Sequence, residues 1–289
     1  MSLLRGKRIL LGVTGGIAAY KTPYLVRLLK KQGAIVKVIL TPSAKDFVTP
    51  LTLATVSQLP VVESFVKNEN NTTDWNNHVK LSLWADFMII APATSNTLSK
   101  MVAAQTDNVL MATYTSARCP VFVIPAMDLD MYTHFGQQEN LKKLKDSGHF
   151  VMDAAHGELA SGLVGTGRMP EPEAIMAFIE QALCQQAPLY GKTVIITAGP
   201  TYEPIDPVRF IGNHSSGKMG IALAEQAAGL GAQVYLVLGP SALSSSHPLV
   251  ETISVQTAEE MYQHVHQRID KCDIAIMSAA VSDYRPKYR

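Results

Sequence analysis

The sequence predicts an α/β protein with two Rossmann-like domains, each a parallel β-sheet flanked by helices, the second incomplete at its C-terminus. Apolar, β-branched runs alternate with helical patterns along the whole chain, an order typical of parallel sheets covered by helices. Residues 6–16 and 191–200 also begin alike, with an apolar run that ends in Thr and Gly. Such a run is typical of a buried parallel strand that leads into a ligand-binding loop.

The same patterns place the individual strands and helices. In the first half we expect strands at residues 8–13, 35–40, 87–91 and 121–124, and helices at residues 17–32, 95–104, 135–147 and 172–184. In the second half we expect strands at residues 193–197, 233–238, 251–255 and 273–278, and helices at residues 217–230 and 258–270. A doubly wound domain normally continues beyond such a last strand, so we expect the second domain to lack its C-terminal part.

The domain boundary is expected between residues 187 and 188. The stretch Gln185-Gln186-Ala187-Pro188 is polar and then breaks at proline, as segments between domains commonly do. Residues 1–187 would form the first domain and residues 188–289 the second.

Composition excludes several classes of protein. With 47% apolar and 17% charged residues, the 289-residue chain is not a disordered one. The net charge of +1 and the scattered basic residues give no indication of binding to nucleic acid or to an acidic membrane. The sequence shows no signal peptide and no apolar run long enough to span a membrane. Cys119, Cys184 and Cys272 lie far apart, which favours reduced thiols in a cytoplasmic protein over a disulfide framework or a metal site.

Three strand ends of the first domain suit a ligand, because open α/β sheets bind ligands at the carboxyl ends of their strands. Thr14-Gly15-Gly16 opens a helix, so it can bind an anion or form only a tight turn, and its spacing is not that of the dinucleotide fingerprint. Residues 91–97 carry small and hydroxyl side chains, which suit a flat phosphorylated ligand or a plain helix N-cap. Residues 125–132 hold two carboxylates and two methionines, which suit a ligand or a turn with core methionines.

Two other features of the first domain have a structural and a functional interpretation. His78 begins an expected helix, where a histidine is either a structural residue or an acid–base catalyst. Residues 157–169 are too rich in glycine for the interior of a helix or strand. We interpret this segment as a mobile lid, with a plain connector as the alternative.

The second domain contains a sequence that matches most of a P-loop. Residues 212–218 read Gly-x4-Gly-Lys, but Met219 follows where a P-loop needs Ser or Thr to hold magnesium. Prolines 200, 204 and 207 also separate this loop from the preceding strand. We therefore reject a P-loop NTPase.

Taken together, the motifs resemble a known family. The first half is similar to the homo-oligomeric flavin-containing cysteine decarboxylases. The whole of residues 6–289 resembles the bifunctional phosphopantothenoylcysteine decarboxylase and phosphopantothenate–cysteine ligase family of coenzyme A biosynthesis. The most specific motifs are Gly167-Arg168-Met169, Pro125-Ala126-Met127-x-x-x-Met131, and the ligase-like segments at residues 196–201 and 213–220.

The resemblance implies a cofactor, a substrate and an assembly. It implies catalysis by His78, and substrate binding by Met131, Gly167, Arg168 and Met169. FMN would oxidise the thiol of 4′-phosphopantothenoylcysteine, carbon dioxide would leave, and the reduced flavin would reduce the ene-thiol to 4′-phosphopantetheine. A trimer-based homo-oligomer with FMN between its subunits is also implied. The residues implied to hold FMN are Gly15, Gly16, Ile17, Thr41, Thr94 and Asn96.

Two catalytic positions depart from the family pattern. Asp128 stands where the family usually has Asn, and its carboxylate would repel a substrate carboxylate unless it is protonated or paired. Ser161 stands where the family usually has a Cys that assists the final reduction, and a hydroxyl is far less acidic than a thiol.

The resemblance implies a second activity for the second half. Arg209 and Asn213 would act on the phosphopantothenate acyl group, with Asn213 handling an acyl-cytidylate intermediate. CTP, with magnesium, would bind at Met277, Ser278, Ala279 and Asp283. The basic run that grips the triphosphate in the family has no convincing counterpart in Lys287 and Arg289, so we expect ligase activity to be lost. The alternative function for the chain is a flavin-binding regulatory or scaffold protein without decarboxylase activity, whereas the ligase-like half argues against a flavin prenyltransferase.

Overall fold

The computed structural model describes residues 3–69 and 72–287. The chain forms two compact units, Ser2–Ala182 and Leu183–Arg289. The division falls within helix α8 (Pro172–Gln185), shortly before residues 187 and 188, where the sequence analysis places the boundary.

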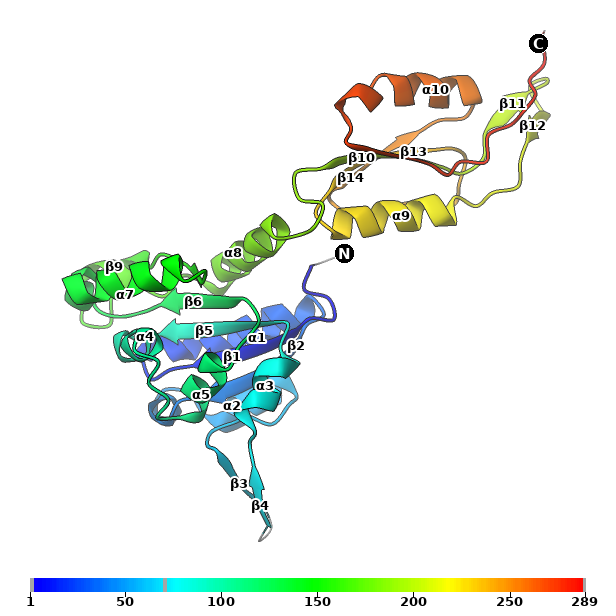
Figure 1. Cartoon of the computed structure of the whole chain (residues 1–289). Helices are drawn as coiled ribbons and strands as arrows, with labels where there is room; N and C mark the ends of the chain where they lie inside the picture. Colours follow the sequence, from blue (N-terminus) through cyan, green and yellow to red (C-terminus); the bar gives the residue numbers. More distant parts are fainter. Residues whose placement is uncertain (1–2, 70–71, 288–289) are drawn as a thin grey trace. The chain divides into compact units, whose positions relative to one another are not determined.

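The first unit is built on a five-stranded parallel sheet with the strand order β2-β1-β5-β6-β7 (Figure 1). Ile9 of β1 lies opposite Val36 of β2 on one side and Phe87 of β5 on the other. The four long strands were predicted from their apolar, β-branched runs, which suit a sheet that is buried on both faces. The strands are β1 (Arg8–Val13), β2 (Ile35–Leu40), β5 (Phe87–Ala93), β6 (Val121–Pro125) and β7 (Phe150–Val151).

Helices cover both faces of this sheet. Successive strand residues point to opposite faces, so Leu10 and Met88 face a core formed with α3, α4, α5 and α7. The alternate residues are buried as well, and Phe122 of β6 contacts Phe178 of α8 on the other face. The helices are α1 (Thr22–Lys31), α2 (Pro50–Ser57), α3 (His78–Trp84), α4 (Ser95–Val102), α5 (Val109–Thr115), α6 (Leu129–Thr133) and α7 (Phe135–Asp146).

Several helices differ from the sequence predictions. The helix expected at residues 17–32 is a 3₁₀ turn, η1 (Ile17–Lys21), followed by α1, because Pro23 fixes the first turn of the α-helix. A second 3₁₀ turn, η2 (Pro42–Asp46), follows β2. Helices α2, α5 and α6 were not predicted. All the residues of α5 from Val109 to Thr113 are buried, so it lacks the polar face that reveals a helix in sequence.

The glycine-rich segment at residues 157–169 was expected to lie outside helices and strands, and this expectation was wrong. It contributes to an antiparallel hairpin of β8 (Ala155–Glu158) and β9 (Val164–Arg168). The glycines permit close packing: a Cβ on Gly165 would lie 2.7 Å from Leu129 Cδ1, and one on Gly167 would lie 2.3 Å from the Met127 carbonyl oxygen. Another hairpin, β3 (Val66–Glu69) and β4 (Thr72–Trp75), was not predicted.

The second unit contains a four-stranded parallel sheet with the order β14-β13-β10-β15. Helices α9 (Lys218–Gly229) and α10 (Ala258–His266) lie on opposite faces of this sheet (Figure 1). The strands are β10 (Thr193–Ala198), β13 (Gln233–Leu238), β14 (Val250–Ser254) and β15 (Ile274–Met277), with a hairpin of β11 (Tyr202–Pro204) and β12 (Phe210–Gly212) and a 3₁₀ turn η3 (Ile269–Lys271). The predicted fold class, parallel sheets flanked by helices, is confirmed in both units.

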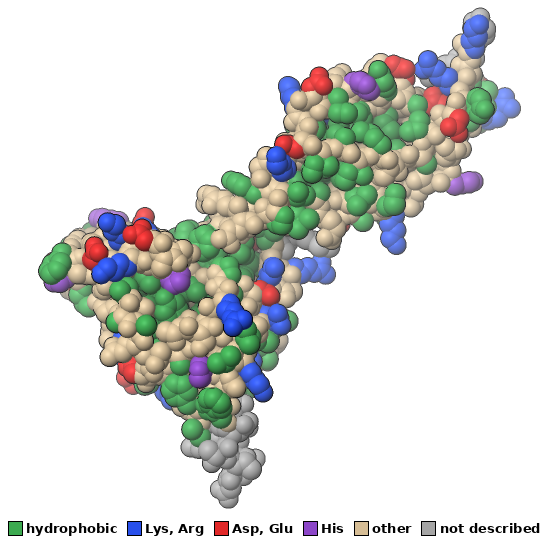
Figure 2. All heavy atoms as spheres, in the orientation of Figure 1, with side chains coloured by type: hydrophobic (Ala, Val, Ile, Leu, Met, Phe, Trp, Pro, Cys, Tyr) green, Lys and Arg blue, Asp and Glu red, His purple; other side chains and the backbone are tan. Residues whose placement is uncertain are grey.

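The surface carries charges of both signs. On the face shown in Figure 2, the Lys and Arg side chains are interspersed with Asp and Glu side chains. Across residues 3–69 and 72–287, no helix combines the length and the apolar character that crossing a membrane requires.

Candidate active site

A cavity of about 950 Å³ lies at the carboxyl edge of the first sheet, within the range of small-molecule sites. Its walls include residues that directly follow β1, β2, β5 and β6, together with the β8–β9 hairpin. The cavity brings together twelve residues singled out from the sequence, namely Gly15, Gly16, Ile17, Thr41, Thr94, Asn96, Asp128, Met131, Ser161, Gly167, Arg168 and Met169.

The loop after β1 approaches the loop after β2 very closely. A Cβ on Gly15 would lie 2.4 Å from Ser43 Oγ and 2.9 Å from the Ser43 carbonyl carbon, so this position accepts only glycine. Gly16 then leads into η1 with an extended backbone, and no side chain caps the helix. The first N–H groups of such a helix lack partners within it and favour an anion. This corner of the cavity suits a phosphate group.

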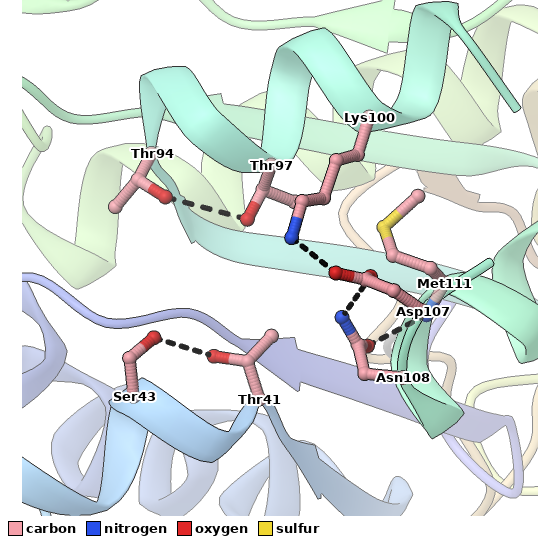
Figure 3. Close-up of polar contacts among 8 residues, drawn as sticks. All are labelled: Thr41, Ser43, Thr94, Thr97, Lys100, Asp107, Asn108 and Met111. Atoms are coloured by element: carbon pink, nitrogen blue, oxygen red, sulfur yellow. Dashed lines mark hydrogen bonds and ion pairs between the residues drawn. The ribbon is translucent and has the colours of Figure 1, made fainter. Parts of the chain in front are cut away.

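A polar wall formed by α4 and the start of α5 lies across from Thr41 and Ser43, which follow β2 (Figure 3). The hydroxyls of Thr94 and Thr97 lie 3.3 Å apart, and Lys100 follows one turn later on α4. Lys100 forms an ion pair with Asp107, and its hydrogen bond lowers the pKa of the Asp107 carboxyl. Asn108 donates a 2.9 Å hydrogen bond to the same carboxylate and caps α5. Lys100 therefore enters the cavity with its charge balanced.

Asp128 also lines the cavity, at the start of α6. Its Oδ1 accepts a 2.7 Å hydrogen bond from the Leu129 amide, as an N-cap residue does. Among the described residues, no Lys, Arg or His forms an ion pair with this half-buried carboxylate. Ser161 lies at the exposed tip of the hairpin, where Leu159 and Leu163 close the turn.

Arg168, at the end of β9, belongs to a small charged network. Its Nη2 lies 2.7 Å from Glu171 Oε1, and Lys21 Nζ lies 2.9 Å from the same oxygen. Lys21 also donates a 2.9 Å hydrogen bond to the Met169 carbonyl oxygen. The hydrogen bond from Lys21 is the largest influence that lowers the pKa of Glu171, with the charges of Lys21 and Arg168 acting in the same direction.

His78 does not line the cavity. It is the first residue of α3, after the N-cap Asn77, and its ring packs edge-on against Phe65 and Trp75. Its Nδ1 atom is buried and has no hydrogen-bond partner in the described part of the chain. A single chain thus keeps the expected acid–base residue apart from the twelve cavity residues.

The cavity residues that were not identified as site residues from the sequence include Lys21, Ser43, Lys100, Asp107, Asn108 and Glu158. Lys100 lies four residues after Asn96 on α4, a spacing that places both on one helix face and could have indicated it. Asp107 and Asn108 precede the helix that the sequence analysis missed, so their position at the sheet edge was hidden.

The second unit has a cavity of about 590 Å³ that includes Met277, Ala279 and Asp283 among its lining residues. Ser278 does not line it, because its hydroxyl donates a 2.7 Å hydrogen bond to the Thr197 carbonyl oxygen. Asn213 and Arg209 also lie outside the lining: Asn213 donates a hydrogen bond to the Val281 carbonyl oxygen, and Arg209 pairs with Asp206. The structure therefore does not gather the expected acyl and nucleotide residues in one cavity of the described chain.

Comparison with known proteins gives the family. Residues 2–184 match the flavoprotein family, and residues 189–289 match the DNA/pantothenate metabolism flavoprotein C-terminal domain. A cysteine/cysteine sulfinic acid decarboxylase from an unknown prokaryotic organism is 51% identical over 83% of this chain and 67% of its own length. The coenzyme A biosynthesis bifunctional protein CoaBC of Vibrio vulnificus is 46% identical over 99% of this chain and 70% of its own length.

Two solved structures share the fold of the first unit. A cysteine-to-serine variant of PPC decarboxylase, complexed with pantothenoylaminoethenethiol, aligns with a TM-score of 0.54 and 28% identity over 62% of this chain and 99% of its own. The FMN-binding protein AtHal3 aligns with a TM-score of 0.52 and 27% identity over 62% of this chain and 97% of its own. The chain therefore belongs to the flavoprotein family that includes the bifunctional proteins of coenzyme A biosynthesis.

Proposed function

We propose that the first unit binds FMN and decarboxylates 4′-phosphopantothenoylcysteine to 4′-phosphopantetheine. One observation carries the proposal. A single cavity is lined both by the Gly15–Gly16 loop, which suits a phosphate group, and by the β8–β9 hairpin, whose Arg168 suits a carboxylate. Membership of the flavoprotein family supports the flavin, and the fold shared with PPC decarboxylase and an FMN-binding protein supports the chemistry.

The residues present fit FMN. Glycine at position 15 lets the loop after β1 pack against Ser43, and the first turn of η1 follows directly with its uncapped N–H groups. Thr41, Thr94 and Asn96 contribute a hydroxyl or an amide to the same cavity. Bound FMN would supply two-electron redox chemistry, as the acceptor for oxidation of the substrate thiol and the donor for reduction of the ene-thiol after loss of carbon dioxide.

The chain's own residues orient the substrate and move protons. The Arg168 guanidinium offers paired N–H donors to a carboxylate, and Met131 and Met169 add apolar surface beside it. Ser161, at the tip of the hairpin, is the residue that stands where the family usually has a Cys. Its hydroxyl donates a proton less readily than a thiol would. A PPC decarboxylase variant with a serine in place of a cysteine is complexed with pantothenoylaminoethenethiol, which supports the binding of such a compound by a site of this fold.

His78 can act as the catalytic histidine only if several copies of the chain assemble. It lies outside the cavity of its own chain, so we place it in the cavity of a neighbouring copy, in a trimer-based homo-oligomer. Light scattering of the flavin-loaded protein checks the assembly, and a monomer at micromolar concentration would contradict it.

Asp128 favours a second substrate, free cysteine, with cysteamine as the product. The cavity is lined by three cations, Lys21, Lys100 and Arg168, and by three carboxylates, Asp107, Asp128 and Glu158. Once the FMN phosphate is added, a substrate with its own phosphate meets an excess of negative charge. The α-ammonium group of free cysteine would instead pair with Asp128, and the relative that is 51% identical is a cysteine/cysteine sulfinic acid decarboxylase. The scaffold alternative is the less supported, because the relative that is 51% identical is a decarboxylase by name.

For the second unit we propose a site related to the CTP-dependent phosphopantothenate–cysteine ligases, with magnesium as the nucleotide's counter-ion. Among the described residues that line its cavity, Arg285 is the only Lys or Arg, and it already pairs with Glu259. A triphosphate normally needs several such donors or a well-held metal. We expect the polypeptide of these 289 residues to release no pyrophosphate from CTP when 4′-phosphopantothenate, cysteine and magnesium are supplied.

The decarboxylase proposal is tested with purified protein loaded with FMN. It is incubated separately with 4′-phosphopantothenoylcysteine and with cysteine, and 4′-phosphopantetheine and cysteamine are measured by mass spectrometry. The flavin-free protein and Arg168→Ala serve as controls. Formation of neither product by the loaded wild-type protein would refute the proposal, and the ratio of the two products decides between the substrates.

A further inference from the structure

Lys21 is a charged residue in an unusual place. Its side chain is only 5% exposed, and a buried ammonium group is costly unless it is paired and hydrogen-bonded. Its partners are the Met169 carbonyl oxygen and Glu171 Oε1, each 2.9 Å from Nζ. Both partners come directly after β9, so Lys21 attaches the end of the hairpin to the end of η1.

The same contacts fix Arg168. Glu171 Oε1 accepts from Lys21 and also from Arg168, whose Nη2 lies 2.7 Å away. Arg168 and Glu171 are partly exposed, with 41% and 55% of their side chains accessible, and a pair of this kind holds its geometry weakly by itself. Lys21 is buried and therefore held in place by its surroundings. Its ion pair with Glu171 fixes the position of Glu171, and through Glu171 that of Arg168.

This network links two walls of the cavity. Lys21 ends the 3₁₀ turn that begins after Gly16, and Arg168 ends the strand that packs on Met127. We propose that Lys21 and Glu171 are positioning residues that hold Arg168 and the base of the hairpin ready for a substrate carboxylate. The proposal rests on the decarboxylase function for the role of Arg168, but the attachment of the hairpin stands apart from it.

The network predicts a particular pattern of effects. Lys21→Met removes the charge and its hydrogen bonds while keeping an unbranched side chain. Glu171→Gln keeps an acceptor oxygen but leaves Lys21 buried without a counter-charge. Each variant should raise KM for the carboxylate substrate about tenfold and change kcat less than about threefold, because binding is lost rather than chemistry.

Tyr24→Phe is the matched control. The Tyr24 hydroxyl donates a 2.7 Å hydrogen bond to Glu173 Oε1. It therefore links α1 to the start of α8, close in sequence to the Lys21 contacts, but Tyr24 does not line the cavity. This variant should leave KM and kcat at wild-type values.

The test combines hydrogen–deuterium exchange with kinetics on the full chain. Exchange at residues 164–169 is measured with and without FMN, and should be faster in Lys21→Met and Glu171→Gln but unchanged in Tyr24→Phe. KM is also measured for Arg168→Ala alone and combined with Lys21→Met. If Lys21 acts through Arg168, adding Lys21→Met to Arg168→Ala should not raise KM any further.

The outcomes are distinct. The proposal would be overturned if both variants kept the wild-type exchange rate and the wild-type KM. It would also be overturned if Lys21→Met raised KM as much in the Arg168→Ala background as in the wild type, or if Tyr24→Phe had the same effects as Lys21→Met. If Lys21→Met does not fold, Glu171→Gln gives the same decision. A wild-type protein without turnover refutes the decarboxylase function, while the exchange data still decide whether Lys21 and Glu171 hold the hairpin.

Discussion

The Met127 amide donates a 2.9 Å hydrogen bond to the carbonyl oxygen of Gly167. Met127 follows β6 and Gly167 lies in β9, so this bond joins the sheet edge to the hairpin on one wall of the cavity. The contact is close enough that a Cβ on Gly167 would lie 2.3 Å from the Met127 carbonyl oxygen. The hairpin can lie this close to the sheet edge only because residue 167 is a glycine and has no Cβ methyl group.

Gly167→Ala should therefore displace the hairpin. Overpacking of this kind typically costs about 1–3 kcal/mol, or a loss of about 2–4 °C in Tm per kcal/mol for a unit of this size. We expect a lower Tm by calorimetry and a raised KM for the carboxylate substrate. Gly157→Ala is the control, because a Cβ there meets Arg168 side-chain atoms at an ordinary 3.5 Å. Similar effects of the two substitutions would show that the Met127 contact is unimportant.

Gly15→Ala should weaken FMN binding. The added methyl group would lie 2.4 Å from Ser43 Oγ and would push the two loops apart. We expect at least about a tenfold increase in Kd, or about 1.4 kcal/mol, measured by quenching of flavin fluorescence. Gly136→Ala should keep wild-type affinity, since its Cβ would lie 3.4 Å from His134 Nδ1. An unchanged Kd for Gly15→Ala would place the flavin elsewhere.

Asp128→Asn should change the choice of substrate. The amide removes a negative charge that opposes a phosphorylated, N-acylated substrate and that would pair with the ammonium group of free cysteine. We expect kcat/KM to rise for 4′-phosphopantothenoylcysteine and to fall for cysteine, each by about tenfold. Parallel changes for both substrates would mean that Asp128 acts only as the N-cap of α6, a role that asparagine also fills.

His78→Asn should leave FMN bound, because His78 is not part of the glycine loop or of the cavity wall of its own chain. It should abolish decarboxylation, because we propose that His78 serves the substrate in the cavity of a neighbouring copy. Its activity should return partly when it is mixed and reassembled with Arg168→Ala, if each cavity takes its histidine from another copy. Absorbance at the flavin band and product formation are measured together. Loss of flavin along with activity would make His78 a structural residue.

The pH response of the hairpin should follow Glu171. The hydrogen bond from Lys21 holds the pKa of Glu171 below its ordinary value, so the pairing stabilises the folded state above the unfolded pKa of about 4.3. This stabilisation is lost as the pH falls through the lower, folded pKa. Amide chemical shifts of residues 168–171 should be constant from neutral pH down to the ordinary glutamate pKa of about 4.3 and should change only at lower pH. In Glu171→Gln this acid transition should be absent.

The sequence by itself determined the two parallel sheets, their main strands and the strand ends that form the cavity. These features depend on local patterns, since an apolar β-branched run followed by Thr and Gly indicates a strand and its loop wherever the chain folds. The strand ends alone left a ligand loop and a plain turn or cap both open, and the resemblance to a family singled out the twelve residues that line the cavity.

Only the tertiary structure decided which charges meet and how the glycine-rich segment folds. Lys21 and Met169 are 148 positions apart, so their contact depends on how the hairpin packs on the sheet edge. The hairpin itself forms because β9 packs on α6 and Met127 where only glycine fits. The buried α5 has no polar face to reveal it, and with α5 unrecognised the pairing of Lys100 with Asp107 could not be foreseen. Which side chains meet across long stretches of sequence depends on how the strands and helices pack, and a local sequence pattern contains no information about that packing.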